Sequence, residues 1–303
     1  MHTVQVLMST YNGERYIRRQ IDSIMAQTGV EVYLLIRDDG SEDSTVSIIQ
    51  EYVEQYPDRI QIVIGKNIGW KKSFIQLLRM AGNFDYYAFA DQDDYWFPDK
   101  EICSIKTLEA DSYMMIPKLV QINMIYADEH LKAIYPVPTR AVDIKYHDEI
   151  YADDFFLGCS MTWNYLAMKL FQQYYPMGSF GHDRWCGVVC YLLGKVYDNP
   201  QKKFYYIRHI GNASTVGNRL HGRIKRIKTF ISGSSTVYDN LGADLLRGYT
   251  NLLGAHDLQI CNDFVIYRHC FQAKFRLLKN LKLRRSSLLS TLLFKISILF
   301  NRV

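Results

Sequence analysis

The stretch Tyr86–Lys100 reads YYAFADQDDYWFPDK and changes character abruptly in its middle. Its first part, Tyr86–Ala90, is an apolar run of strand length that ends in three carboxylates, Asp91, Asp93 and Asp94. Carboxylates this close repel one another unless a cation or hydrogen-bond donors offset their charge. Hard cations such as Mg²⁺ and Mn²⁺ prefer carboxylate and phosphate oxygens. The stretch therefore indicates either a divalent-metal site at the end of a strand or a solvated, Asp-rich turn.

Strand-like and helix-like segments alternate in the chain before this stretch. Strands are predicted at Val4–Thr10, Val32–Ile36 and Ile60–Ile64, and a segment with helical periodicity follows each of them. Such alternation with short connections is typical of a mainly parallel sheet with helices on both faces. Ligands of such sheets bind outside the carboxyl ends of the strands. Polar clusters stand at these ends, at 9–13, 37–41, 65–69 and 91–94.

The pattern after Pro98 is mixed. The sequence predicts further elements in this order: a helix over Asp99–Ala110, a strand over Leu119–Ala127, a strand-like segment over Asp153–Met161, a helix over Asn164–Gln173, a helix ending at Leu193, and two short strands, Lys195–Tyr197 and Phe204–Ile207. Beyond about Thr215 the chain becomes helical and basic. We therefore expect an α/β domain over 1–215 and a basic helical C-terminal region over 216–303.

Composition and motifs exclude several classes of protein. A content of 48% hydrophobic residues excludes wholesale disorder. The first strand is followed by STYNGERY, which lacks the GxGxxG of a dinucleotide site, and no P-loop occurs. The six cysteines form no CxxC pair, which favours reduced thiols. No signal-peptide pattern and no apolar run of 18 residues is present, which predicts a cytoplasmic protein.

The net charge of +5 is unevenly distributed. Residues 264–303 contain nine Lys or Arg and no Asp or Glu, which leaves residues 1–263 with a net charge of −4. This distribution argues against a general nucleic-acid binder and for a locally basic docking surface. The cations of the tail alternate with Phe and Leu, and Leu288–Phe300 is nearly all apolar. The tail indicates either an interfacial segment on the cytoplasmic face of the inner membrane or a helical subdomain that packs on the core or on a second copy in a homodimer.

Several motifs together resemble the inverting family 2 glycosyltransferases of the GT-A fold. In chain order, the motifs are STYNGERYIRRQIDSI, DDGSEDST, KNIG, DQDD, GHDRW and RHIGN, and they cover about residues 3–212. The spacing of the last two is most similar to bacterial rhamnosyl- and hexosyltransferases of surface polysaccharide synthesis. The resemblance implies a Rossmann-like mixed sheet flanked by helices, here with a basic helical C-terminal extension. It also implies a donor such as UDP-hexose or dTDP-rhamnose, and a lipid-linked oligosaccharide as acceptor.

The resemblance also implies roles for residues on the donor side. Ser9, Tyr11 and Asp39 would contact the nucleoside, with Asp39 accepting from the imide N–H of a pyrimidine. Asp39 also suits a type I turn in DDGS, and both uses are compatible. Asn67 would line the donor pocket. Asp94 would either bind hydroxyls of the donor sugar or cap the turn before Trp96.

The metal and the catalytic base follow from the same resemblance. Asp93 would bind Mg²⁺ or Mn²⁺ between the diphosphate oxygens, Asp91 would bind the ribose or a metal-bound water, and His209 would contact the metal or the diphosphate. Asp183 would take the proton from the acceptor hydroxyl. Its position at a predicted helix start suits an ordinary N-cap as well.

Three residues are candidates for contact with the acceptor: Trp96, His182 and Trp185. Packing is the alternative for the tryptophans, and packing or positioning for His182.

The chain departs from the polymer-synthesising members of the family. It has no QxxRW motif and no membrane span, which favours single sugar additions over processive synthesis. Two alternatives to a glycosyltransferase stay open. A nucleotidyltransferase also uses metal-binding acids, although STYNGERY lacks the glycine-rich loop that such an enzyme needs. A catalytically silent nucleotide-sugar-binding partner of another transferase would carry the same donor site.

Overall fold

A computed structural model describes residues 1–112, 115–134, 142–178, 180–208 and 237–302. The chain divides into two compact units, and each consists of several segments. The first unit comprises Met1–Val142, Phe156–Gln173 and Gly181–His209. The second comprises Asp143–Phe155, Tyr174–Phe180 and Ile210–Val303, so it takes in two stretches that no sequence pattern set apart.

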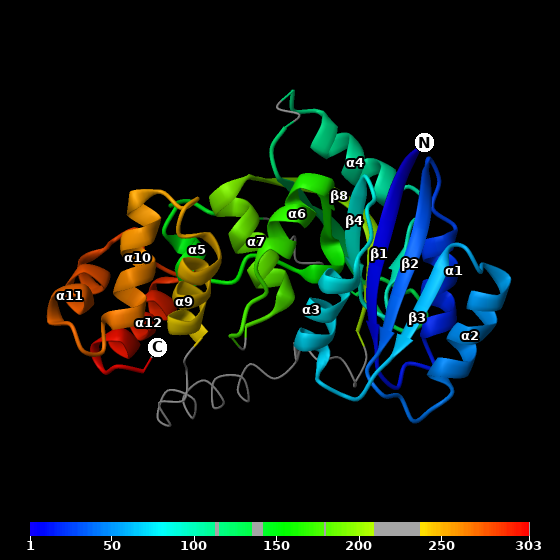
Figure 1. The fold of residues 1–303 in the computed structure, drawn as a ribbon, viewed down its shortest axis with the longest axis horizontal. Helices are drawn as coiled ribbons and strands as arrows, with labels where there is room; N and C mark the ends of the chain where they lie inside the picture. Colours follow the sequence, from blue (N-terminus) through cyan, green and yellow to red (C-terminus); the bar gives the residue numbers. More distant parts are fainter. Residues whose placement is uncertain (113–114, 135–141, 179, 209–236, 303) are drawn as a thin grey trace. The chain divides into compact units, whose positions relative to one another are not determined.

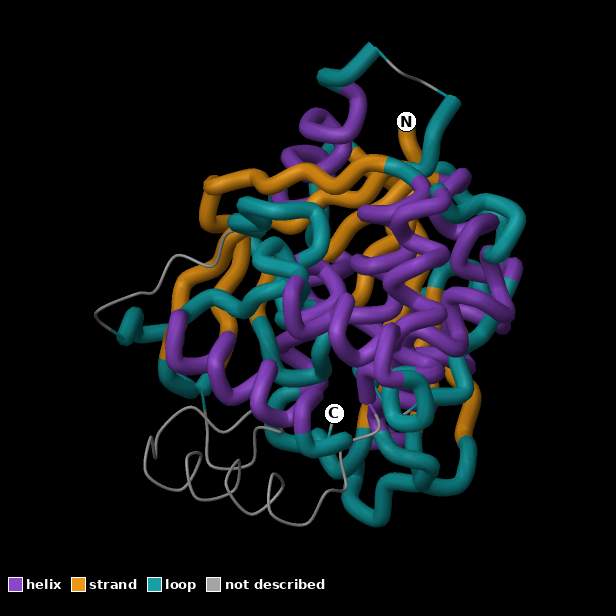
Figure 2. The backbone as a smooth tube through the Cα atoms, turned by 90° about the vertical axis from the view of Figure 1, so that its left-hand side faces the viewer, coloured by secondary structure: helices purple, strands orange, loops and turns teal. Residues whose placement is uncertain are grey.

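The first unit is built on a mixed sheet of eight strands in the order β3-β2-β1-β4-β7-β6-β8-β5 (Figures 1 and 2). The strands are β1 (His2–Thr10), β2 (Val30–Asp38), β3 (Ile60–Ile64), β4 (Tyr86–Ala90), β5 (Tyr95–Trp96), β6 (Lys118–Ala127), β7 (Met161–Asn164) and β8 (Lys195–Ile207). β1 pairs in parallel with both β2 and β4, so Val6 lies opposite Leu34 on one side and Ala88 on the other. This arrangement confirms the predicted parallel arrangement of the first four strands.

Helices follow the strands as the periodicity predicts. Those of the first unit are α1 (Ile17–Met25), α2 (Thr45–Gln55), α3 (Trp70–Met80), α4 (Lys100–Glu109), α6 (Tyr165–Gln173) and α7 (His182–Leu193). Ser44 stands at the N-cap of α2, although its side chain makes no capping hydrogen bond.

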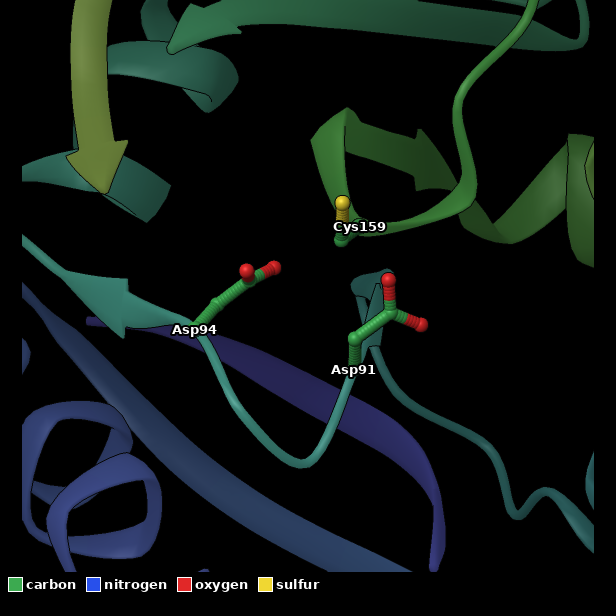
Figure 3. A group of neighbouring side chains, drawn as sticks. All are labelled: Asp91, Asp94 and Cys159. Carbon is green, nitrogen blue, oxygen red and sulfur yellow. The ribbon is translucent and has the colours of Figure 1, made fainter. Parts of the chain in front are cut away.

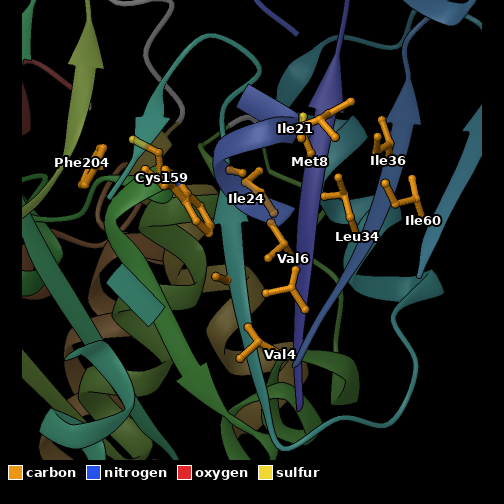
Figure 4. Packing of buried hydrophobic residues seen from close by; sticks show 14 of the residues in the cluster. Val4, Val6, Met8, Ile21, Ile24, Leu34, Ile36, Ile60, Cys159 and Phe204 are labelled. Carbon is orange, nitrogen blue, oxygen red and sulfur yellow. The ribbon is translucent and has the colours of Figure 1, made fainter. Parts of the chain in front are cut away.

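Apolar side chains cover both faces of the sheet. On one face, Val4, Val6 and Met8 of β1 pack in one cluster with Ile21 and Ile24 of α1 (Figure 4). The other face carries a chain of aromatic contacts, in which Phe89 of β4 lies 5.2 Å from Phe74 of α3 and 4.5 Å from Trp163 of β7, centroid to centroid. Burial on both faces explains why the central strands read as continuous apolar runs.

Two predicted elements were wrong. The strand-like segment Asp153–Met161 is not a strand: Gly158–Ser160 forms a short 3₁₀ turn, η1, and the strand β7 begins only at Met161. The two short strands predicted at Lys195–Tyr197 and Phe204–Ile207 are one strand, β8. Its register against β6 shifts near Asn123, and this irregularity accommodates the polar residues that interrupt the apolar pattern.

The second unit is helical in its described part. It contains α5 (Glu149–Ala152), α9 (Val237–Tyr249), α10 (Ala255–Ile266), α11 (Phe271–Lys279) and α12 (Leu288–Leu299). Lys295 of α12 donates to the carbonyl oxygen of Asn280, 2.9 Å away, at the C-terminal end of α11. A cation there satisfies a carbonyl that the helix leaves without a partner. The predicted boundary between 215 and 216 lies outside the described residues and stays a prediction.

Candidate active site

The loop between β4 and β5 carries the DQDD stretch. Asp91 and Asp94 both point from this loop toward Cys159 of η1 (Figure 3). One ligand atom from each of the three residues lies within 4.8 Å of the others. Within the described ranges, this is the group of acidic, His or Cys side chains whose geometry suits a metal ion. Of these three residues, only Asp91 was also predicted from the sequence as a residue of the metal site.

The electrostatics of the loop are those of crowded, poorly solvated carboxylates. Burial, followed by repulsion from Asp93 and Asp183, raises the pKa of Asp91 to about 7. Burial and the charges of Asp91 and Asp93 raise the pKa of Asp94 well above its ordinary value. Oδ1 of Asp94 accepts a hydrogen bond from the backbone N–H of Ile207 at 3.3 Å, whereas Oδ2 is buried without a partner among the described residues. A cation near the loop would offset this repulsion.

Asp93 is partly exposed and lies within electrostatic reach of both Asp91 and Asp94. It is not a member of the converging group with Cys159, so its role as the principal ligand stays a prediction. His209 lies outside the described residues, and its predicted contact with the metal or diphosphate stays a prediction as well.

Asp183 is brought to the DQDD loop by α7. The N-cap of this helix is Gly181, and Asp183 lies in the first turn. The N-cap interpretation of Asp183 is therefore wrong. Its Oδ1 accepts from the N–H of Arg184 at 2.8 Å, and its charge contributes to the raised pKa of Asp91. The fold thus places the predicted base beside the predicted metal loop, although the two are far apart in sequence.

Asp39 is buried behind the end of β2, with 2% of its surface exposed. One oxygen pairs with the guanidinium of Arg37 at 2.6 Å and accepts from the N–H of Ile68 at 2.9 Å, while the other accepts from the N–H of Gly69 at 2.8 Å. Asp39 therefore anchors the KNIG loop to the end of β2. Three donors leave part of its lone-pair capacity for a nucleobase, whose contact stays a prediction.

Ser9 and Asn67 lie near this anchor. The Ser9 hydroxyl donates to Oγ of Ser73 at 2.6 Å, and Ser73 Oγ also accepts from Arg37 at 3.0 Å. Asn67 is exposed and accepts from the N–H of Gly69 at 3.1 Å.

Gln92 was missed by the sequence analysis. Its side-chain oxygen accepts from the N–H of Tyr11 at 2.9 Å, and its side-chain nitrogen donates to the Tyr11 carbonyl at 3.1 Å. This double hydrogen bond joins the metal loop to the loop after β1 and leaves the Tyr11 ring 45% exposed. The signal available in the sequence was only its position inside DQDD.

The structure corrects three predicted contacts with sugar. Trp96 is 1% exposed, and the ammonium of Lys100 lies 3.6 Å from its ring centroid, so no acceptor sugar can stack there. Trp185 is fully buried in α7. Asp94 is also fully buried, which excludes contact with donor hydroxyls in this arrangement.

His182 packs inside the unit rather than facing a substrate. It is 4% exposed, and its ring stacks on Phe74 at 3.9 Å between centroids. Burial lowers the pKa of His182 to about 3, so the ring is neutral at physiological pH. This confirms the packing alternative and contradicts a role as an acceptor contact.

Comparison with known sequences decides the family. The sequence model of "Glycosyl transferase family 2" matches residues 5–157, which is half of the chain. The chain belongs to glycosyltransferase family 2. The matched range contains the DDGS, KNIG and DQDD segments of this family 2 chain, while Asp183 lies beyond it.

Curated relatives match shorter pieces. The dTDP-rhamnosyl transferase RfbG of Shigella flexneri is 41% identical over 97 residues, which cover 31% of this chain and 34% of that protein. Glycosyltransferase GlyA of Streptococcus pneumoniae is 25% identical over 312 aligned positions, which cover 94% of this chain and 42% of that protein. The match thus spans about a third of the length of RfbG and less than half of GlyA.

Solved structures confirm the predicted GT-A-like fold. S. aureus TarS 1–349 in complex with UDP-GlcNAc has a TM-score of 0.58 and 16% identity, covering 99% of this chain and 80% of that one. The mannosyltransferase PcManGT from Pyrobaculum calidifontis, in complex with GDP-Man and Mn²⁺, has a TM-score of 0.50 at 15% identity, covering 98% of this chain and 79% of that one. No helix in the described part of this family 2 chain has both the length and the apolar character needed to cross a membrane.

Proposed function

We propose that the chain transfers a sugar from a nucleoside-diphosphate sugar to an acceptor hydroxyl in one displacement that inverts the anomeric carbon. The observation that carries this proposal is the position of Asp183 near the end of β4: its neighbour His182 packs on Phe89 of β4 with ring centroids 4.6 Å apart, and the charge of Asp183 contributes to the raised pKa of Asp91. A base on one side and a metal loop on the other are the two parts that the reaction needs.

The residues of the DQDD loop fit a divalent cation. Crowding by neighbouring carboxylates contributes to the raised pKa values of Asp91 and Asp94, and a cation would relieve this crowding. Asp91 and Asp93 are partly exposed, so a diphosphate can reach them, and we assign the cation to these two. Asp94 and Cys159 lie buried beneath and would support the loop. The cation, Mg²⁺ or Mn²⁺, would neutralise charge that develops on the leaving diphosphate; the structural neighbour PcManGT is described with Mn²⁺.

Asp183 would accept the proton of the attacking hydroxyl. Its position in the first turn of α7 favours the charged form through the helix dipole, while its hydrogen bond from the N–H of Arg184 fixes the orientation of the carboxylate. Gly181 makes room for this orientation, since a Cβ there would overlap Asp183 Oδ1.

The donor is proposed to be UDP-hexose or dTDP-rhamnose. The named relative RfbG supports dTDP-rhamnose, and the complex of TarS supports a UDP-sugar. The partly satisfied carboxylate of Asp39, behind the end of β2, is the proposed partner of the pyrimidine.

The acceptor is proposed to be a lipid-linked oligosaccharide at the cytoplasmic membrane surface. The helical unit supports this proposal because many large apolar side chains are exposed within one segment of it. They are Phe271, Phe275, Leu281, Leu288, Leu289, Leu292, Leu293, Leu299 and Phe300. Lys279 and Lys282 are exposed among them, and residues 264–303 contain no acidic residue. Cations around an apolar surface complement anionic lipid headgroups, at about 1 kcal/mol for each Lys.

Vesicle sedimentation tests this surface. Vesicles of phosphatidylglycerol and phosphatidylcholine should carry the protein down, and pure phosphatidylcholine vesicles should carry down much less. Leu288→Ser with Leu292→Ser should weaken binding, whereas Leu252→Ser, at an exposed leucine (52%) outside this segment, should not. A stable dimer in solution that the double variant dissociates, with no vesicle binding, would assign the surface to a second copy instead.

Turnover separates the enzyme from a silent binding partner. Purified protein with a divalent cation and a nucleotide-sugar panel should release nucleoside diphosphate when an extract with lipid-linked oligosaccharides is added. Donor binding without release or transfer in any extract would instead support the binding partner.

A further inference from the structure

We infer that Trp70 is the platform on which the sugar ring of the acceptor stacks. Trp70 is the first residue of α3 and is 44% exposed. All four tryptophans of the sequence lie in the described ranges, and the other three are at most 1% exposed. The inference rests on the proposed function, because it assigns a residue to the acceptor side of the same site.

Trp70 borders the predicted base. A Cβ placed on Gly181 would overlap Oδ1 of Asp183 and would lie 3.6 Å from Cη2 of Trp70. The indole edge and the carboxylate therefore lie close together over Gly181. A glycine at this position lets the carboxylate lie there, because any Cβ would collide with it.

The orientation of the indole is fixed by its neighbours. Its ring meets the buried ring of His182 edge to face, with centroids 5.7 Å apart. The backbone N–H of Gly69, just before Trp70, donates to Asp39 at 2.8 Å. The same loop thus positions both the proposed donor anchor and the indole. The ammonium of Lys71 lies over the indole, 5.5 Å from the ring centroid, and Trp70 still has 44% of its surface exposed.

The chemistry of the position favours an acceptor sugar. Pyranose rings present apolar C–H faces and polar hydroxyl edges, and an exposed indole fixed in orientation matches the C–H face. A base must lie within hydrogen-bond reach of the hydroxyl that it deprotonates, so the space beside Asp183 belongs to the acceptor. The nucleobase of the donor is proposed at Asp39 instead. Trp70 thereby takes the role that the sequence analysis gave to Trp96 and Trp185.

Tryptophan fluorescence tests this inference directly, because acrylamide can reach only the exposed indole. The wild-type protein with Mn²⁺ and UDP is titrated with acrylamide in the presence of methyl rhamnoside, methyl glucoside, methyl galactoside or, as a control, sorbitol. At least one glycoside should protect the accessible indole from quenching, and sorbitol should not. Trp70→Tyr should lose the accessible component of quenching, which assigns the signal.

Variants give the second measurement. Trp70→Ala should raise KM for the protecting glycoside about tenfold at nearly unchanged kcat, and Trp70→Tyr should retain most of the affinity. Tyr165→Ala, at a 38% exposed aromatic residue elsewhere in the first unit, should change neither. Calorimetric binding of the nucleotide-sugar should be equal in all variants.

Two outcomes would overturn the inference. One is a protein that binds the donor but in which every glycoside leaves acrylamide quenching unchanged, or in which Trp70→Ala leaves the KM for the glycoside unchanged. The other is protection by UDP alone, which would assign Trp70 to the nucleobase. Failure to bind any nucleotide-sugar would instead contradict the proposed function, so the two failures are distinguishable.

Discussion

Asp183, in the first turn of α7, lies close enough to Asp91 after β4 for its charge to contribute to the raised pKa of Asp91, and its neighbour His182 packs on Phe89 of β4 with ring centroids 4.6 Å apart. Asp93 and burial act on Asp91 in the same direction. The first unit thus holds four carboxylates near the end of β4, those of Asp91, Asp93, Asp94 and Asp183. Such a concentration of like charge destabilises a fold unless a cation or a proton offsets it. This crowding of carboxylates explains why we expect a metal ion at the DQDD loop, with the proposed base, Asp183, close by.

Asp183→Asn is predicted to retain donor binding and to lower the rate of transfer by about three orders of magnitude. The amide keeps the shape of the side chain but cannot take the proton. The measurement is nucleoside diphosphate release, alongside calorimetric binding of the donor. Asp58→Asn, at an exposed turn, is the matched control and should behave as wild type. Transfer at a comparable rate in Asp183→Asn would remove Asp183 as the base.

Asp93→Ala is predicted to abolish metal-dependent donor binding, because a ligand that bridges to the diphosphate is lost. Asp91→Ala should weaken the same binding. Calorimetric titration with the nucleotide-sugar, with Mn²⁺ and with EDTA, measures the effect. Asp99→Ala is the control, because Asp99 follows DQDD closely in the sequence but its carboxylate pairs with Lys203 at 2.5 Å. Equal metal-dependent binding in Asp93→Ala would leave Asp91, Asp94 and Cys159 as the ligands.

Arg37→Ala is predicted to lower the free energy of unfolding by about 3 kcal/mol, because it leaves the buried Asp39 carboxylate without its charged partner. The KNIG loop should loosen as well, so donor affinity should fall. Urea denaturation measures the first effect. The control is Arg18→Ala, which breaks the exposed pair between Arg18 and Glu51 and should leave stability unchanged. Similar losses in the two variants would contradict the anchoring role of Asp39.

The pair His147–Asp257 is predicted to make the helical unit less stable above neutral pH. A hydrogen bond to Asp257 raises the pKa of His147 above its ordinary value of 6.5, so this stabilisation is complete below 6.5 and is lost as the pH rises through the raised value. Burial alone would raise the pKa of Asp257, but hydrogen bonds from His147 and Tyr151 outweigh burial and lower this pKa from its ordinary value of 3.8. The stabilisation from these hydrogen bonds is therefore present above pH 3.8 and is lost only in more acidic solution.

Urea denaturation at pH about 6 and about 8 measures this effect. Wild type should lose stability between the two, and His147→Gln should lose less. An equal loss in both proteins would show that other groups cause the pH dependence.

The sheet could be predicted from the sequence because its strands obey local rules. Apolar runs of strand length, such as Val4–Thr10, end in polar clusters and alternate with helical periodicity, so both the parallel arrangement and the functional edge of the sheet follow. The prediction of a strand over Asp153–Met161 was wrong for a local reason: Gly158 begins a 3₁₀ turn inside an apolar stretch. Periodicity alone does not distinguish a buried turn from a strand.

Burial at the site could not be predicted. Trp96 and Trp70 both stand beside polar motifs in the sequence, but Trp96 lies over Lys100 inside the core, while Trp70 is exposed at the start of α3. The difference depends on which side of the sheet each indole reaches, and that is set by long-range packing. The anchoring of Asp39 by Ile68 and Gly69 likewise joins segments about 30 residues apart and leaves no pattern in either one.

The most direct test of the account is a calorimetric titration of the purified protein with a panel of UDP-, dTDP- and GDP-sugars, in Mg²⁺ or Mn²⁺ and again in EDTA. The account predicts that at least one UDP- or dTDP-sugar binds with a divalent cation, and that EDTA or Asp93→Ala removes this binding. No binding of any nucleotide-sugar, with either cation, to a protein whose folding is verified would contradict it.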